Sequence, residues 1–348
     1  MLVHLLVLNY NGRRLLGRCL PSVLEAAWAS SHRCRVTVID NDSRDDSVAW
    51  LAREFAEVEV IRRPNRGLCS FNDVVPRLEG PVALLLNNDI GLDRHAVDPL
   101  VEALLAARPG EPPWFMAAPK CWLPDGTTYE GFRTAVRWRW GLVQATARFA
   151  GHEAWIDRPG LTASAGAAMA VDRDVFAMLG GFDPLYLPGR LEDLDFAFRA
   201  YLAGYRARYV PESVAYHLGM ATFGSVFGQE GCDRLALRNT LLFQWKNLRD
   251  PLHRARQWTG LFTRLVFDLL RAPRTRAARR WPLVRAWLAA RSRWRAMGPS
   301  PWPAPDNPSG ERDFFRRFHP RQLQSESAWA PATEAVSSLP LVEAEACR

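Results

Sequence analysis

Carboxylates, amides and one histidine recur in this 348-residue chain at positions where they could carry chemistry. Asp40 and Asp42 follow one buried, β-branched run, and Asn87, Asn88 and Asp89 follow another. A carboxylate at the end of a buried strand is well placed to hold a divalent cation, and Mg²⁺ or Mn²⁺ can in turn bind a diphosphate. Each motif alone also fits a structural role, because Asp and Asn favour turns and helix caps.

A further acidic group opens a predicted helix with the sequence EDLD, residues 192–195. Carboxylates are favoured there by the helix dipole. Asp195 and Arg199 are four residues apart, so we expect them to pair on one helix face in a structural role. His217 follows an apolar strand pattern, where a single histidine is more often a core residue than a ligand. Taken one at a time, these residues therefore do not establish a site.

Alternating strands and helices are expected to position the first two motifs. Apolar runs predict buried strands at Val3–Leu8, Val36–Ile39, Val58–Ile61 and Val82–Leu86. The segments between them predict helices at Leu15–Ala27, Ser47–Phe55 and Arg66–Leu78. This order predicts a mostly parallel sheet covered on both faces, with ligands at the carboxyl ends of the strands. The loops Asn9–Asn11, Asp40–Ser43 and Asn87–Asp89 should therefore share one edge.

The second half is less regular. Residues 112–190 are rich in Gly, Pro and aromatic residues and favour a short mixed sheet. Beyond them the pattern predicts a helix at Leu191–Ala203, a strand at Arg206–Val210, another strand ending at His217, and a helix at Glu230–Asn247.

Seven segments in this order resemble the inverting family-2 glycosyltransferases, in particular their bacterial rhamnosyltransferase-like branch. They are VLNYNGRRLLGRCLPSVL, VIDNDSRDDS, RRPNRGLCSFND, LLLNNDIGLD, ASAGAAMAVDRDVFAMLGGFDPLY, EDLDFAFRAYLAGYRARYVPESVAYH and LRNTLLFQWKN. Each is loose by itself, but together they cover about residues 3 to 247. The resemblance implies an α/β fold of the nucleotide-diphospho-sugar transferase type, called GT-A. Its features are a mostly parallel central sheet flanked by helices and a small second sheet, and here a helical C-terminal extension follows.

The resemblance also implies a function. The chain would move a sugar from a nucleotide-diphosphate sugar, with dTDP-rhamnose as one candidate donor, to an acceptor hydroxyl in surface polysaccharide assembly. Inversion, Mg²⁺ or Mn²⁺ dependence and a glycan or lipid-linked acceptor are expected with it. Asp193 matches the family's general base, which takes a proton from the acceptor hydroxyl. Asp89 matches the last position of the metal-binding acidic triplet, and His217 would be a second metal ligand or a diphosphate contact.

Further residues are assigned to the substrates by the same resemblance. On the donor side, Asn9 and Tyr10 would lie at the base and ribose, Asp40 would accept a hydrogen bond from the base, and Arg66 would lie near the donor. The remaining expected nucleotide-sugar contacts are Asp42, Asn87 and Asn88, and the expected acceptor-side residues are Gly166 and Glu192. The triplet departs from the acidic pattern because Asn87 is an amide, so metal binding would rest on Asp89 and the substrate phosphates.

The formal charge of +8 is concentrated in one region. Residues 271–295 hold nine arginines and no carboxylate. Two interpretations of residues 258–295 remain open: helices packed on the catalytic domain, or attachment to an anionic membrane surface. Nucleic acid is not an expected partner, because the basic residues form no recognisable nucleic-acid-binding motif. The sequence leaves the oligomeric state open.

The expected organisation has three parts. Residues 1–250 form the catalytic domain, with a nucleotide-sugar-binding half at 1–110 and an acceptor and catalytic half at 111–250. Residues 251–297 form a basic amphipathic helical extension, and 298–348 form a linker and a disordered tail. The sequence leaves open whether residues after 310 are ordered, since the segment ERDFFRRFHP could dock back onto the body. The six cysteines form no CxxC pair, and the N-terminus has no basic leader, so we expect a cytoplasmic protein, with peripheral attachment to the inner membrane face as an option.

Other functions remain as alternatives. An inactive nucleotide-sugar-binding relative would keep the fold without turnover, and a membrane-associated adaptor would act through the basic C-terminal helices. A nucleotidyltransferase would share the architecture and the metal, but it would not need the EDLD helix together with a downstream histidine.

Overall fold

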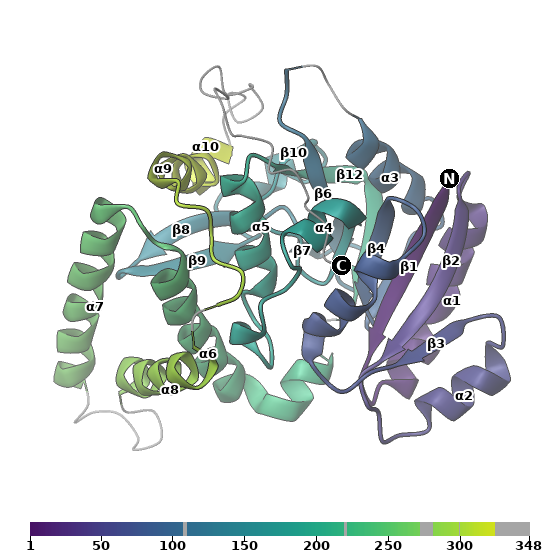
Figure 1. The fold of residues 1–348 in the computed structure, drawn as a ribbon, viewed down its shortest axis with the longest axis horizontal. Coiled ribbons are helices and arrows are strands. Elements are labelled where there is room, and N and C mark those ends of the chain that lie inside the picture. Colours follow the sequence, from purple (N-terminus) through teal and green to yellow (C-terminus); the bar gives the residue numbers. More distant parts are fainter. Residues whose placement is uncertain (107–109, 219–220, 272–280, 299, 324–348) are drawn as a thin grey trace, which may run out of the picture.

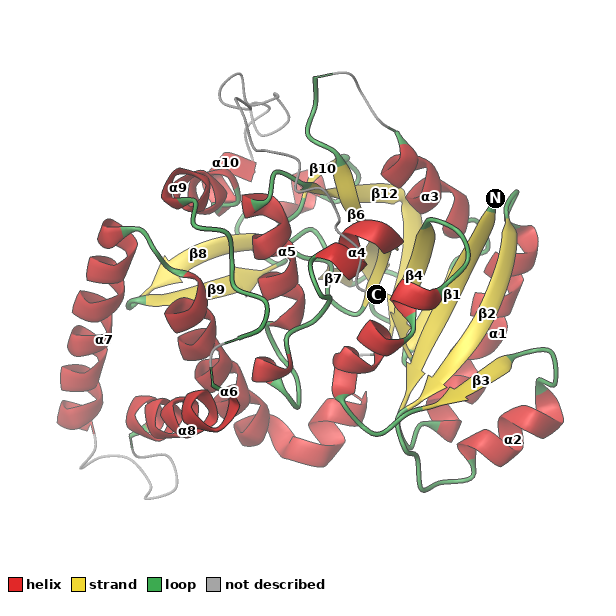
Figure 2. Ribbon diagram, in the orientation of Figure 1, coloured by secondary structure: helices red, strands yellow, loops and turns green. Residues whose placement is uncertain are grey.

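A ten-stranded sheet organises the computed structural model, which describes residues 1–106, 110–218, 221–271, 281–298 and 300–323 (Figures 1 and 2). Its main strand order is β10-β12-β6-β11-β4-β1-β2-β3, and β5 and β7 pair with β12 and β6. Helices lie on both faces of the sheet. The mixed α/β class with a central sheet and a small second sheet is therefore confirmed.

The N-terminal half is a parallel arrangement, as its apolar runs predict. The strands β1 (Leu2–Asn9), β2 (Arg33–Asp40), β3 (Glu59–Arg62) and β4 (Val82–Asn87) pair in parallel. The helices α1 (Arg13–Ala29) and α2 (Ser47–Glu54) connect them. β1 and β4 are buried on both faces, which explains why their sequences are continuously apolar rather than alternating.

The helix predicted at Arg66–Leu78 is wrong. This segment forms two 3₁₀ turns, Gly67–Asp73 and Val75–Arg77. Pro76 lacks the N–H that a continuous α-helix would need at this point. The side chain of Asn72 also bonds the backbone of a distant residue, donating to Phe182 O at 2.7 Å and accepting from Phe182 N at 2.9 Å. Tertiary contacts therefore replace the helical ones.

The other half of the sheet is mixed. β11 (Ala168–Asp172) lies antiparallel between β4 and β6 (Trp114–Trp122). The two strands predicted around 206–217 form one strand, β12 (Arg206–His217), with a register shift between Val210 and Val214. The short strands β5 (Ile90–Leu92), β7 (Tyr129–Gly131) and β10 (Gly160–Leu161) complete it. β5 pairs with the end of β12, so that His217 lies opposite Ile90.

A second hydrophobic core lies beside the sheet. The small sheet β8 (Ala135–Arg139) and β9 (Leu142–Thr146) packs there with α5 (Glu192–Leu202) and α6 (Ala221–Asn247). Helices were predicted at both α5 and α6, although α6 begins earlier than expected and is broken at Gly228, which has φ 63°. Two further helices, α3 (Val97–Leu105) and α4 (Arg173–Met178), cover the main sheet.

The C-terminal region is more ordered than the sequence suggests. α7 (Pro251–Arg271) and α8 (Pro282–Met297) are followed by α9 (Pro308–Arg317) and α10 (Pro320–Leu323). Residues 308–323, whose order after residue 310 the sequence left open, are helical, and Phe314, Phe315 and Phe318 insert into the second core. Residues 324–348 of that predicted tail lie outside the described residues. Within the described part of the chain, no helix combines the length and apolarity needed to cross a bilayer.

Candidate active site

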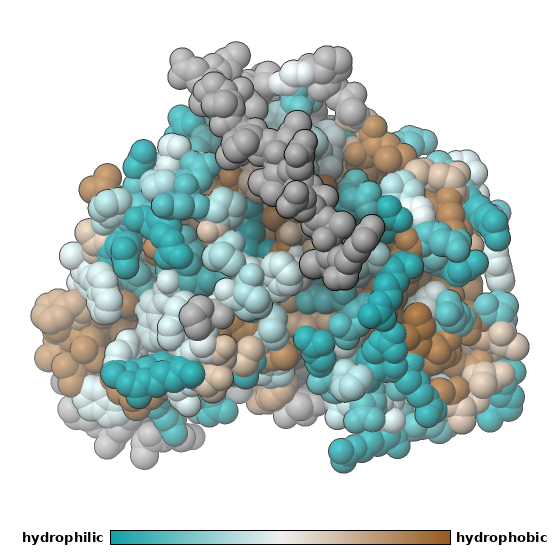
Figure 3. Space-filling view, in the orientation of Figure 1, coloured by the Kyte–Doolittle hydropathy of each residue, from teal (hydrophilic) through white to brown (hydrophobic). Residues whose placement is uncertain are grey.

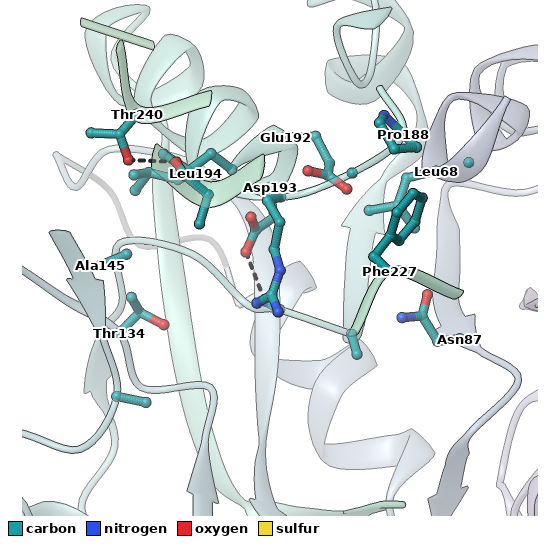
Figure 4. A pocket seen from close by; sticks show the side chains of 18 of the residues that line it. Leu68, Asn87, Thr134, Ala145, Pro188, Glu192, Asp193, Leu194, Phe227 and Thr240 are labelled. Atoms are coloured by element: carbon teal, nitrogen blue, oxygen red, sulfur yellow. Dashed lines mark hydrogen bonds between the residues drawn. The ribbon is translucent and has the colours of Figure 1, made fainter. Parts of the chain in front are cut away.

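A cavity of about 1020 Å³ opens at the carboxyl ends of β1 and β4. Its opposite wall is formed by the small sheet and by the start of α5. Figure 4 shows Asp193 on this wall, with Asn87 on one side and Thr134 and Ala145 on the other. Nine of the residues singled out from the sequence line it: Asn9, Tyr10, Asn87, Asn88, Asp89, Gly166, Glu192, Asp193 and His217.

Asp89 and His217 are neighbours within the cavity wall. His217 Nε2 lies 3.3 Å from Asp89 Oδ2, and its Nδ1 lies 2.7 Å from Glu130 Oε2. The antiparallel pairing of β5 with β12 brings them together, since Leu218 N also donates to Asp89 O at 2.9 Å. Burial disfavours the imidazolium, but the hydrogen bonds to Asp89 and Glu130 outweigh it and raise the pKa of His217 to about 9.

The donor atoms at this pair fit a divalent cation once His217 Nε2 has lost its proton, because a metal ion binds the neutral imidazole. Asp89 is 5% exposed, and its Oδ1 is buried without a hydrogen-bond partner. Glu130 faces the other ring nitrogen of His217, which can orient the imidazole. Neither here nor at any other place in the described residues are three or more His, Cys, Asp or Glu side chains arranged to hold a metal ion. A cation here would thus take few protein ligands, as Mg²⁺ does when substrate phosphates supply the others.

Asp193 occupies the first turn of α5 and is held by a backbone donor. Gly166 N donates to Asp193 Oδ2 at 3.2 Å. Gly166 has φ +65°, and a Cβ there would lie 2.6 Å from the ring of Phe132. Any other residue would be strained and would displace Phe132 or the loop. Glycine at 166 therefore lets the loop approach Asp193 and fix one oxygen of its carboxylate.

Glu192, the neighbouring carboxylate, has a perturbed environment. Its Oε2 is buried without a hydrogen-bond partner. Burial and the charge of Asp193 raise the pKa of Glu192 to about 8. Glu192 is therefore neutral at pH 7.

Asn9 ties the strand ends together. Its Nδ2 lies 3.1 Å from Asp40 Oδ1 and 3.1 Å from Ser47 Oγ, and its Oδ1 accepts from Asn88 Nδ2 at 2.9 Å. Asn9 itself is fully buried. One side chain thereby holds β1, the loop after β2 and the loop after β4 in one arrangement.

Three residues expected at the nucleotide sugar lie outside the cavity lining. Asp40 is 2% exposed and is turned inward, where Oδ2 accepts from Ser43 N at 3.1 Å. Asp42 is exposed at a position with φ +61°. Arg66 lies 3.4 Å from Asp73 in a partly exposed ion pair. Asp40 thus contacts the predicted residue Asn9 from behind, but none of these three side chains lines the cavity.

Sequence reasoning missed several lining residues. Glu130, on β7, was not singled out because a lone carboxylate in an irregular stretch carries no spacing signal. The arginines Arg137, Arg190 and Arg264 also line the cavity, from β8, the loop before α5, and α7. They come from distant segments, so a sequence pattern could not have grouped them.

A buried polar network supports α5 beneath the site. Lys246 Nζ lies 2.8 Å from Asp195 Oδ2 and 2.6 Å from Asp183 Oδ2, and Arg199 Nε lies 2.9 Å from Asp195 Oδ2. Burial disfavours the charged form of Asp195, but Lys246 and Arg199 outweigh it and lower the pKa of Asp195 to about 2. The structural pairing predicted for Asp195 and Arg199 is confirmed.

Comparisons with known proteins agree with this geometry. Residues 5–121 match a family model described as glycosyl transferase family 2. No curated protein sequence matches the chain. The crystal structure of GalNAc-T7 with UDP, GalNAc and Mn²⁺ is similar, with a TM-score of 0.52 and 18% identity over 71% of this chain. This chain spans about half of that protein's length, 48%.

A second solved structure is that of S. aureus TarS 1-349 in complex with UDP-GlcNAc. It has a TM-score of 0.50 and 13% identity, over 82% of this chain and 79% of the other. At such identities the likeness concerns the fold. Residues 5–121 thus match glycosyl transferase family 2, and the chain has the GT-A fold over the part that these structures cover.

Proposed function

We propose that the protein is an inverting, nucleotide-sugar-dependent glycosyltransferase. The observation that carries this proposal is the shared cavity, in which the Asp89–His217 pair and Asp193 lie among the same lining residues. The family match of residues 5–121 supports the reaction class. The solved structures with UDP and with UDP-GlcNAc support a nucleotide-diphosphate sugar as the donor class.

In the proposed reaction, Asp193 acts as the general base. An acceptor hydroxyl attacks the anomeric carbon while its proton passes to Asp193, and the bond to the diphosphate oxygen breaks with its electron pair leaving on the nucleoside diphosphate. One in-line displacement inverts the anomeric configuration. The N–H of Gly166 holds one carboxylate oxygen at 3.2 Å, which orients the carboxylate of Asp193 in the cavity.

Asp89 and His217 are the residues that would hold a divalent cation. Such a cation offsets negative charge on the donor diphosphate when it is bound. The Mn²⁺ in the GalNAc-T7 structure supports Mn²⁺ or Mg²⁺ as the ion. Asn9 and Asn88 keep the strand ends in place beside it.

We expect Asp89→Ala to weaken Mn²⁺-dependent donor binding by about 100-fold, because the change removes the carboxylate whose buried oxygen is unpaired. Calorimetric titration with UDP-, GDP- and dTDP-sugars, dTDP-rhamnose included, measures this with Mn²⁺ and with a chelator. Asp174→Ala is the control, since the side chain of Asp174 is 74% exposed on α4. If no nucleotide sugar binds under any metal condition, the proposal is wrong, and an adaptor acting through the C-terminal helices becomes the better interpretation.

The pKa of Glu192 predicts a pH effect on donor affinity. Glu192 is neutral below pH 8 and gains a negative charge as the pH rises through about 8. That charge repels the donor diphosphate, so KM for the donor should rise about fivefold between pH about 7 and pH about 9. In Glu192→Gln the rise should be smaller, because only the loss of positive charge from His217, whose pKa is about 9, then contributes to it. Steady-state kinetics across this range measures it, and an equal rise in both proteins would contradict the assignment.

A further inference from the structure

The helix α7 carries an apolar face toward solvent. Its exposed large apolar side chains are Leu252, Trp258, Phe262, Val266, Phe267, Leu269 and Leu270. Phe262 is 69% exposed and Trp258 is 60% exposed. Figure 3 shows hydrophobic residues gathered at the left edge of the molecule, where Figure 1 places α7. An apolar face of this kind on a folded protein commonly marks a contact surface.

The orientation of α7 is fixed by its packing. A Cβ on Gly260 would lie 2.1 Å from the backbone N of Gly141, so the helix and the turn between β8 and β9 touch backbone to backbone. The side turned inward carries Leu261, which belongs to the second core, and Leu265, which packs against it. It also carries two polar groups, the 3% exposed Gln257 and the partly buried Asp268. Trp140 stacks on Phe267 with ring centroids 6.0 Å apart. The helix therefore carries apolar side chains on both its inward and its outward sides, unlike an ordinary amphipathic surface helix, whose outward side is polar.

The exposed charges on α7 and α8 have one sign. On the described parts of α7 and α8, the exposed charged side chains are all arginines: Arg254, Arg256, Arg285, Arg291 and Arg295. Asp268 is the only carboxylate in the sequence of either helix, and it is partly buried. A second copy of this surface would bring arginines against arginines with no exposed carboxylate on these helices to pair them. An anionic surface complements it.

We infer that the outward face of α7 docks on an anionic lipid bilayer. Trp258 and Phe262 would enter the interfacial layer, where aromatic side chains are favoured, while the flanking arginines contact lipid phosphates. The helix would lie in the plane of the interface.

The docking has a consequence for the substrate. Arg264, on the same helix, lines the cavity. A docked α7 would hold the acceptor side of the cavity close to the bilayer, as an acceptor attached to a lipid requires. This consequence rests on the proposed function, whereas the docking itself does not.

Flotation with lipid vesicles tests the inference on the full chain. The vesicles are phosphatidylcholine alone, or phosphatidylcholine mixed with phosphatidylglycerol. We expect the wild type to bind the mixed vesicles, and this binding should weaken with added salt. One variant, called the α7 variant, carries both Trp258→Gln and Phe262→Gln, and it should lose about tenfold or more of the binding. The matched control is Trp28→Gln, since Trp28 is 73% exposed on α1, on the other side of the molecule (Figure 1), and should bind as the wild type does.

Other outcomes overturn the inference. Equal binding by the α7 variant and the wild type would place the contact elsewhere. Absence of vesicle binding, with a dimer in sedimentation that the α7 variant abolishes, would identify a second copy as the partner. Absence of both would leave α7 without the proposed role. Donor hydrolysis is measured on the same proteins and should be unchanged in both variants, so failure of docking is distinguishable from failure of the glycosyltransferase proposal.

Discussion

Asp193→Asn is expected to lower kcat by about 10²–10⁴-fold while leaving donor affinity nearly unchanged. The asparagine can no longer take the acceptor proton. Its Oδ1 can still accept from Gly166 N, as one carboxylate oxygen does in the wild type at 3.2 Å, so the loop and α5 should keep their arrangement. Single-turnover kinetics with donor and acceptor, together with donor titration, separates the chemical step from binding.

The control for this substitution is Asp174→Asn, which makes the same chemical change at a 74% exposed side chain outside the cavity lining. It should retain wild-type kcat. A change in kcat of less than about threefold in Asp193→Asn would remove this residue as the base. If the variant instead loses donor affinity and turnover together, Asp193 contributes to binding rather than to proton transfer.

The largest effect on stability is expected from Lys246→Met. Lys246 is 3% exposed and lies between Asp183 and Asp195, which are 1% and 0% exposed. Removing the ammonium leaves two buried carboxylates with less compensation, which typically costs about 3–5 kcal/mol. Urea denaturation followed by circular dichroism measures the free energy of unfolding.

Lys120→Met is a natural comparison, because these are the two lysines of the chain. Lys120 pairs with Asp157 at 2.7 Å, but the side chain of Asp157 is 78% exposed. Such a pair is worth about 1 kcal/mol or less, so this variant should be close to the wild type. If both variants lost the same free energy of unfolding, burial would not make the Lys246 network contribute more to stability than the exposed pair of Lys120 and Asp157.

The parallel half of the fold was predictable because its signals are local. Continuous apolar runs such as those of β1 and β4 define strands that are buried on both faces, and the helices between them follow a clear period. The same reasoning failed at residues 66–78 and left the order of the residues after 310 open. In the first, Pro76 and the contact of Asn72 with Phe182 override helical propensity. In the second, a tail of mixed composition is ordered by phenylalanines that enter a core built from distant segments.

In the candidate site, too, local features could be predicted from the sequence, whereas contacts between distant segments could not. Residue types at strand ends and at the start of α5 are local features, so the sequence alone determined which edge of the sheet and which helix turn hold the polar groups. Tertiary structure decided which of them meet. The β5–β12 pairing sets His217 beside Asp89, and the inward turn of Asp40 removes it from the cavity. Glu130 joins them from a separate strand, because contacts between distant segments depend on strand register and packing rather than on local pattern.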